Sequence, residues 1–136
     1  MTLPEDMLAH NRQVIADFRA NGGVEPGRHL LLLTTTGART GQKRTSPMMY
    51  IPEGDRLLVI ASNAGAPRHP NWYHNLVAHS DVTVEVTGET YEARARVTRG
   101  EERERLWADI TRQFPFFAEH ESRVSRTIPV VSLERP

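Results

Sequence analysis

Residues 34–50, with the sequence TTTGARTGQKRTSPMMY, hold the side chains best suited to binding an anion. Arg39, Lys43 and Arg44 stand among two glycines and six Ser or Thr residues, and no Asp or Glu occurs from residue 26 to residue 52. Glycine lets backbone N–H groups converge on an anion, and an arginine fork binds phosphate or carboxylate through two contacts. Further donors are the hydroxyls of Thr34, Thr35, Thr36 and Thr40. The stretch therefore predicts a site for a phosphorylated ligand, with a solvent-exposed β-turn as the alternative.

A second stretch, residues 61–76 with the sequence ASNAGAPRHPNWYHNL, has the composition of a wall for a flat ring. Its Ala and Gly residues let a ring approach the backbone closely, and Trp72 and Tyr73 can supply apolar surfaces. The second stretch adds to the case for a bound ligand over a plain solvent-exposed turn. The alternative for Trp72 is an ordinary place in the hydrophobic core.

The composition excludes several kinds of chemistry. The chain has no cysteine, which rules out disulfides, thiolate metal sites and cysteine nucleophiles. His69, His74 and His79 do not have the i, i+4 spacing of a helical metal pair, so no metal site is expected, and no nucleophile-elbow motif occurs. Seventeen basic and 17 acidic residues give zero net charge, which argues against binding to nucleic acid. Neither a signal peptide nor a run of roughly 20 apolar residues, as a membrane span requires, is recognisable.

The hydrophobic pattern predicts the elements that must position these residues. Short apolar or alternating runs predict strands at 29–35, 43–51, 56–62 and 126–134, and a hairpin over 81–98; helical spacing predicts helices at 4–20, 70–79 and 100–114. Tight turns between consecutive strands require antiparallel pairing. The expected fold class is therefore mainly β, a small barrel of about six antiparallel strands with peripheral helices.

The length of 136 residues predicts one domain, with an N-terminal helix over 1–25 and a barrel over 28–136. Pro129 is expected to place the last strand at a sheet edge or a bulge. Pro115 is expected to end the third helix, so that the aromatic residues after it turn back over the mouth of the barrel. GARTG lacks the third glycine of a dinucleotide-binding fingerprint and is followed by a predicted strand, which excludes that motif.

Three stretches resemble the deazaflavin-dependent nitroreductase family of actinobacteria: LLTTTGARTGQKRTSPMMY, ASNAGAPRHPNWYHNLVAHSDVTVEV, and the segment from residue 100 to the C-terminus. The resemblance covers residues 28–136 and keeps the order of the elements. It implies a split β-barrel of the flavin-reductase and pyridoxamine-phosphate-oxidase kind. It also implies coenzyme F420, a deazaflavin with a phosphate and an oligoglutamate tail, whose anionic groups suit the basic turn.

The resemblance also implies which residues form the site. Arg39, Thr40 and Arg44 are expected to meet the phosphate and tail. The rest of the coenzyme site is expected to comprise Thr45, Ser46, Pro47, Met48, Met49, Ile60, Ala61, Ser62, Asn63, Asn71, Trp72, Tyr73, His74 and Asn75. Phe117 and His120 are expected in the substrate pocket, and Tyr73, Ser62 and His120 are the candidate proton donors.

Three residues depart from the family pattern. Asn63 stands where the best-known members carry Lys, and Met49 and Phe117 stand where they carry Tyr. Because Phe117 has no proton to donate, quinones are expected to be better acceptors than nitro compounds.

The expected activity is hydride transfer from the reduced deazaflavin to a quinone, a nitroaromatic or an activated enone. The expected partner is this small-molecule acceptor, and the protein is expected to be a monomer or homodimer in the cytoplasm, with or without peripheral contact with the membrane. Two alternatives stay open. One is a reductase that uses FMN on the same barrel, and the other is a non-catalytic protein that binds a cofactor or lipid.

Overall fold

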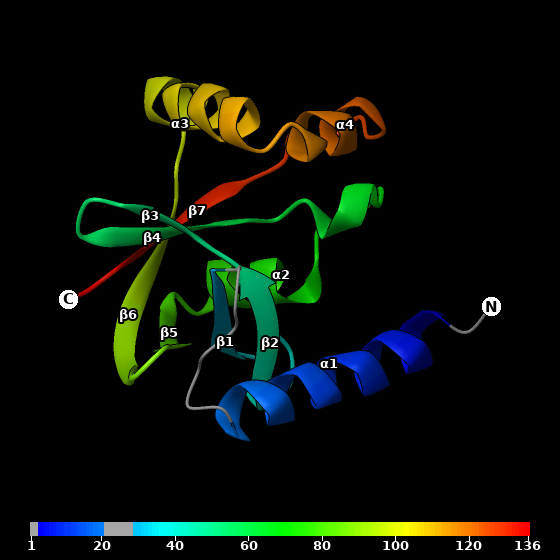
Figure 1. The fold of residues 1–136 in the computed structure, drawn as a ribbon, viewed down its shortest axis with the longest axis vertical. Coiled ribbons are helices and arrows are strands. Elements are labelled where there is room, and N and C mark those ends of the chain that lie inside the picture. Colours follow the sequence, from blue (N-terminus) through cyan, green and yellow to red (C-terminus); the bar gives the residue numbers. More distant parts are fainter. Residues whose placement is uncertain (1–2, 21–28) are drawn as a thin grey trace.

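The computed structural model describes residues 3–20 and 29–136. Within these ranges a curled antiparallel sheet is surrounded by helices (Figure 1). The strands are β1 (Leu30–Thr36), β2 (Lys43–Met49), β3 (Ile51–Glu53), β4 (Arg56–Ile60), β5 (Asp81–Val86), β6 (Glu89–Val97) and β7 (Val130–Glu134). The helices are α1 (Leu3–Ala20), α2 (Asn71–Ala78), α3 (Gly100–Gln113) and α4 (Phe116–Ser122), with a short 3-10 helix, η1 (Asn63–Gly65).

The sheet curls because one bent segment pairs at both of its ends. The strand order is β2-β1-β5-β6-β7-β4-β3, so β2 and β3 lie at opposite ends of it, yet only Tyr50 separates them in the chain. β2 pairs with β1 and β3 pairs with β4, both antiparallel, so the bend at Tyr50 brings the two ends of the sheet together. The predicted antiparallel barrel is confirmed, and the predicted strand over 43–51 is in fact two strands.

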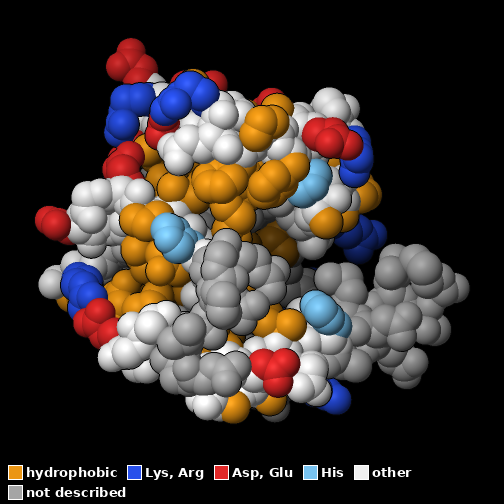
Figure 2. All heavy atoms as spheres, viewed as in Figure 1, with side chains coloured by type: hydrophobic (Ala, Val, Ile, Leu, Met, Phe, Trp, Pro, Cys, Tyr) orange, Lys and Arg blue, Asp and Glu red, His pale blue; other side chains and the backbone are white. Residues whose placement is uncertain are grey.

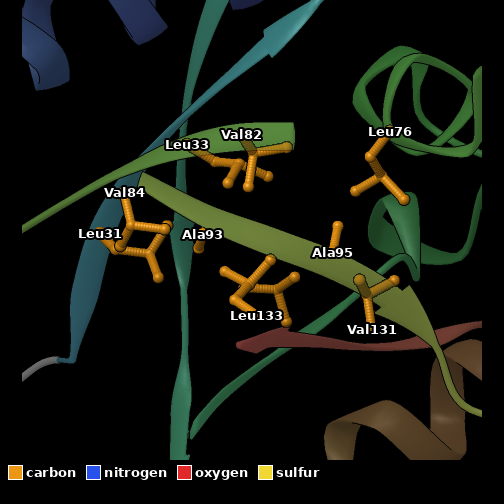
Figure 3. Close-up of a cluster of buried hydrophobic side chains, with 10 residues drawn as sticks. Leu31, Leu33, Leu76, Val82, Val84, Ala93, Ala95, Val131 and Leu133 are labelled. Carbon is orange, nitrogen blue, oxygen red and sulfur yellow. The ribbon is translucent and has the colours of Figure 1, made fainter. Parts of the chain in front are cut away.

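Alternating side chains fill the inside of the curled sheet. In Figure 3, Leu31 of β1 lies beside Val84 of β5 and Leu33 beside Val82, while Val131 and Leu133 of β7 and Leu76 of α2 complete the cluster. The interior cluster consists of Leu31, Leu33, Val59, Leu76, Val82, Val84, Ala93, Ala95, Val131 and Leu133. Because neighbouring residues of a strand face opposite ways, the residues between these are free to pack on the outside.

The outer face of the sheet is covered by α3 and α4 (Figure 1). The outer cluster consists of Ile51, Leu58, Leu106, Trp107, Ile110, Phe117, Ile128 and Val130. The break at Pro115 is confirmed, since α3 ends at Gln113, but the sequence did not predict that the chain re-enters a helix at once. The prediction for Pro129 is wrong: β7 lies between β6 and β4, and Pro129 precedes it, so no ladder bond requires its missing N–H.

Helix α1 lies against β2, on the side of the sheet away from α3 (Figure 1). Its Phe18 is buried, and its Arg19 forms an ion pair with Glu85 of β5 at 2.9 Å. The predicted helix over 4–20 agrees with α1, and the expected boundary between 25 and 28 falls outside the described residues. No helix in the described ranges is long and apolar enough to cross a membrane.

The surface seen from the direction of Figure 1 separates apolar from charged side chains. Hydrophobic side chains gather towards the middle of the face that this view shows, and many of the charged ones lie at its rim (Figure 2).

Candidate functional site

A groove of about 1050 Å³ opens between the β1–β2 turn, β2, the start of α2 and one face of α1. It brings together nine of the residues predicted for the coenzyme: Arg39, Thr40, Arg44, Thr45, Ser46, Asn71, Trp72, His74 and Asn75. Asn11, Arg12 and Ile15 of α1 also line it. Sequence reasoning missed these three because only the packing of α1 against β2 brings them to the groove.

The groove is positively charged, and its cations lack acidic partners. Arg12, Arg39, Lys43 and Arg44 line it, and no carboxylate of the described residues does. None of these four cations forms an ion pair within residues 10–20 and 29–136. Lys43 donates to the Thr36 hydroxyl at 2.9 Å, and Arg44 donates to the Gln42 side-chain oxygen at 3.2 Å. Both acceptors are uncharged, so neither cation is neutralised, and the positive charge remains available to a phosphate or carboxylate.

The β1–β2 turn is closed by its own backbone. The Gly37 N–H donates to the Gln42 carbonyl at 2.7 Å, and the Gly41 N–H donates to the Gly37 carbonyl at 2.9 Å. Gly41 has φ +71°, which glycine adopts without strain, and a Cβ on Gly37 would lie 2.6 Å from the Thr40 hydroxyl. The two glycines therefore shape the turn. Their N–H groups are already used, so the predicted anion nest is wrong for these two groups.

Asn75 ties helix α2 to this turn. Its side-chain oxygen accepts the Ala38 N–H at 3.0 Å, and its side-chain nitrogen donates to the Thr35 hydroxyl at 3.1 Å. Thr35 is buried, and the Thr34 hydroxyl is bonded to that of Thr45 at 2.8 Å. Asn75 therefore sets the distance between the turn and α2. Thr35 is buried, so its hydroxyl holds Asn75 in place and is not exposed to a ligand.

The loop after β4 holds a second set of predicted residues outside the groove. Ala61 and Ser62 are buried, while Asn63 and Ala64 have left-handed backbones with φ +50° and +54°. Asn adopts this region more readily than Lys, and the Asn63 side chain donates to the Arg68 carbonyl at 3.0 Å. The local backbone thus gives a physical reason for Asn63 where the resemblance implies Lys.

Arg126 holds this loop, and sequence reasoning missed it. Its guanidinium donates to the backbone carbonyls of Ala61 at 3.1 Å and Ser62 at 2.8 Å, and it lies 2.8 Å from Nδ1 of His69. Burial lowers the pKa of His69, and the neighbouring Arg126 and His74 lower it further. An arginine in the segment before the last strand carries no local sequence signal for such a contact.

The remaining coenzyme predictions fall on the walls of the barrel. Met48 and Tyr73 pack against the interior cluster, and Met49 and Ile60 pack against the outer cluster. Pro47 lies opposite Leu32 in the β1–β2 ladder. These residues, like Ala61, Ser62 and Asn63, do not line the groove, and their contact with a coenzyme ring stays a prediction.

The structure corrects the prediction that Phe117 walls an open pocket. Phe117 is 5% exposed and packs in the outer cluster beside Trp107, with ring centroids 6.5 Å apart. The reason is that α4 begins directly after Pro115, which turns Phe117 inward and leaves Phe116 42% exposed. His120 packs against the β4–α2 loop. The closeness is shown by Gly65 of that loop, where an added Cβ would lie 3.6 Å from the His120 Cα.

A curled antiparallel sheet with helices packed on its outer face is a split β-barrel. The heme storage protein HutZ of Vibrio cholerae has a similar fold, with a TM-score of 0.61 at 16% identity over 91% of this chain and 89% of that chain. At this identity the likeness concerns the fold alone. The profile of the F420H(2)-dependent quinone reductase family matches residues 10–135, and the chain belongs to this family.

Individual relatives agree with this assignment. An F420H(2)-dependent quinone reductase of Mycobacterium tuberculosis strain H37Rv is 41% identical over 108 residues, which are 77% of this chain and 72% of the relative. The solved F420-H2 dependent reductase FDR-A is 38% identical, with a TM-score of 0.71 over 79% of this chain and 95% of that chain. A structure described as a domain-swapped dimer is 34% identical, with a TM-score of 0.73 over 96% of this chain and 99% of that chain.

The predicted class of enzyme and its cofactor are therefore confirmed at the level of the family. The family consists of oxidoreductases, and coenzyme F420 is the cofactor that its description names. The FMN alternative finds no support in these comparisons.

Proposed function

We propose that this chain transfers a hydride from reduced coenzyme F420 to a quinone. The family provides the class of reaction. The observation that carries the proposal is the groove, which four cations line without a described carboxylate. A phosphate and several glutamate carboxylates are the ligand groups that such a lining favours.

The residues of the groove fit the anionic part of this coenzyme. Arg39, Lys43 and Arg44 would hold the phosphate and the first glutamates, and Arg12 extends the positive lining to α1. Trp72, at the start of α2, would lie beside the part of the coenzyme that leads to the ring. When bound, the deazaflavin supplies the hydride from its ring carbon C5. The protein's part is to fix its position and to exclude water.

Quinones need no acidic side chain for this reaction. A quinone that accepts a hydride becomes a hydroquinone anion, which can take its proton from water. The preference for quinones thus no longer depends on Phe117, whose buried position makes it part of the fold. Tyr73, Ser62 and His120 remain the predicted proton donors for acceptors that need one, although Ser62 is buried.

The test is oxidation of the reduced coenzyme by a naphthoquinone in the presence of the protein. The absorbance of oxidised deazaflavin should return only when quinone and protein are both present. Binding is measured separately by tryptophan fluorescence, because Trp72 lines the groove while Trp107 is buried in the outer cluster. Trp72→Phe is the control that should remove this signal. A protein that binds the coenzyme without quinone-dependent oxidation would contradict the proposal.

We further propose that the protein is a homodimer. A relative described as a domain-swapped dimer matches 96% of this chain at 34% identity, which supports this arrangement over the monomer. Light scattering of the purified protein decides between them, since a mass of 15.4 kDa belongs to one chain. The predicted cytoplasmic location stays a prediction that cell fractionation can test.

A further inference from the structure

Arg126 makes an unusual set of contacts for a half-buried arginine. Its guanidinium donates to three backbone carbonyls, those of Ala61 at 3.1 Å, Ser62 at 2.8 Å and Ala66 at 3.1 Å, and lies 2.8 Å from Nδ1 of His69. No carboxylate forms an ion pair with it among the residues that the structure describes. Burial lowers the pKa of Arg126. Its charge is therefore balanced by carbonyl dipoles of a single loop.

Besides Arg126, a few bonds hold the shape of this loop, among them that from the Asn63 side chain to the Arg68 carbonyl at 3.0 Å. Asn63 and Ala64 have left-handed backbones, which cost free energy for residues with a side chain. Two short-range bonds, Gly65 N–H to Ser62 carbonyl at 3.0 Å and Ala66 N–H to Asn63 carbonyl at 2.9 Å, close η1. A positively charged fork on three carbonyls is stronger than either of these neutral bonds. Arg126 thus joins this loop to the segment before β7, together with the Ala61 N–H, which donates to the Pro129 carbonyl at 3.0 Å.

The contact with His69 fixes the protonation of that ring. Arginine has only donors, so Nδ1 of His69 must accept, and the proton of the neutral ring is then on Nε2. The ring lies 4.6 Å from that of Tyr73 and 5.7 Å from that of His74, between centroids. His74 lines the groove. A continuous chain of contacts therefore runs from Arg126 through His69 to the start of α2.

We propose that Arg126 is a positioning residue, which fixes the 61–69 loop and, through the Nε2–H tautomer of His69, the start of α2. Its catalytic consequence rests on the proposed function, since this loop and α2 carry the residues predicted to border the coenzyme ring. The basic turn holds the anionic part of the coenzyme by a different set of contacts. Loss of Arg126 should therefore disturb the placement of the ring more than the affinity for the coenzyme.

The first test uses the protein without coenzyme. Histidine labelled with 15N reports the tautomer of His69, and amide exchange reports the order of residues 61–69. In the wild type, His69 should be the Nε2–H tautomer. In Arg126→Gln, both tautomers should be populated, and the pKa of His69 should rise because the Arg126 charge that lowers it is lost, while burial and His74 still act on the ring. Amide exchange in the loop should accelerate about tenfold to a hundredfold, as expected for the loss of charge-assisted bonds.

Two further variants keep the test decisive. Arg126→Lys keeps the charge without the fork and should restore the tautomer and loop protection in part. It also replaces Arg126→Gln if that variant fails to fold. Arg105→Gln is the control, because Arg105 is 65% exposed and its ion pair, at 3.6 Å, is with Glu53, far from this loop in the chain. The proposal is overturned if Arg126→Gln has the same loop amide exchange and the same His69 tautomer as the wild type. It is also overturned if Arg105→Gln changes both quantities as much as Arg126→Gln does.

The second test uses the coenzyme. In single turnover at saturating reduced coenzyme, Arg126→Gln should transfer the hydride about tenfold to a hundredfold more slowly, because a displacement of the order of 1 Å has effects of this size. Its dissociation constant for the coenzyme should stay within about threefold of the wild-type value. An affinity loss with an unchanged hydride rate would refute the positioning role. If the wild type does not bind the coenzyme at all, the proposed function fails, and the first test still decides whether Arg126 fixes the loop and His69.

Discussion

Two groups of cations in this molecule have opposite surroundings. In the groove, Arg12, Arg39, Lys43 and Arg44 have no acidic partner among the described residues. At the other group, which we call the arginine–glutamate cluster, every cation is paired. It consists of Arg56, Arg96, Glu53, Glu102 and Glu134, with nitrogen–oxygen distances of 2.7 Å to 3.6 Å. A chain with no net charge thus keeps its acids away from one site, and the overall balance conceals a strongly positive groove.

The difference separates binding from stability. In the arginine–glutamate cluster, Arg96 and then Arg56 lower the pKa of Glu102 from its ordinary 4.5 to about 2, so these charges stabilise the folded chain. The cations of the groove have no such partner among the described residues, and we propose that they bind the anionic ligand instead. Substitutions in the first group should therefore change unfolding, and substitutions in the second should change coenzyme affinity.

The largest effect is expected for the double variant Arg39→Ala, Arg44→Ala. Each charge-assisted contact contributes about 1.5–3 kcal/mol, so the affinity for coenzyme F420 should fall by about two to four orders of magnitude. The hydride rate at saturating coenzyme should change little, because on the proposed function these residues hold the anionic part and not the ring. Fluorescence titration and single-turnover kinetics measure the two quantities. Arg96→Ala is the matched control and should bind like the wild type; a hydride rate that collapses while affinity holds would assign Arg39 and Arg44 to catalysis.

Phe117→Ala should lower stability by roughly 3–5 kcal/mol, the usual cost of removing a buried aromatic ring. The result is read from denaturant unfolding. Phe116→Ala, at a ring that is 42% exposed, is the control and should cost much less. If Phe117→Ala left stability unchanged and raised the Michaelis constant for the quinone, Phe117 would be part of the substrate pocket and not of the outer cluster.

Glu102→Gln should lower stability at pH 7 by about 1 kcal/mol, since solvent screens a half-exposed ion pair. A carboxylate whose pKa is depressed on folding contributes stability above its ordinary pKa of 4.5 and loses it as the pH falls towards 2. The difference in melting temperature between wild type and variant should therefore shrink between pH 5 and pH 3. A constant difference over this range would show that Glu102 stabilises the fold by other means.

The smallest effect is expected for Arg12→Ala on α1, about a threefold to tenfold loss of affinity, because an exposed contact with an anion is screened by solvent. The loss should grow with the number of glutamates in the coenzyme tail if Arg12, which extends the positive lining from the basic turn to α1, meets the tail. Titration with coenzymes of short and long tails measures this. Equal losses for both tails would place Arg12 at the phosphate.

Sequence reasoning located the part of the site that is local in the chain. The basic turn, β2 and the start of α2 are short segments. Their Arg, Thr, Asn and Trp side chains indicate by type what they can bind, and nine of their residues line the groove. The bend at Tyr50 was invisible because residues 43–51 have one continuous strand pattern, and the pairing of both halves with distant strands makes them two.

The residues that were missed depend on contacts across the fold. Arg12 reaches the groove because Phe18 and Arg19 anchor α1 on the sheet, and Arg126 reaches its loop from 57 or more positions away. Phe117 was misplaced because an aromatic residue after a helix is compatible with a pocket or a core. Only the start of α4 directly after Pro115 decides its direction.

The central claim is that the unpaired cations of the groove bind the anionic part of the coenzyme. It is tested by the affinities of the wild type and of Arg39→Ala, Arg44→Ala for intact coenzyme F420 and for the same deazaflavin without phosphate and glutamates. The wild type should prefer the intact coenzyme by about a hundredfold or more, and the double variant should lose most of this preference while binding the shortened ligand as before. An equal preference in both proteins would contradict the claim, because the anionic groups would then be bound elsewhere.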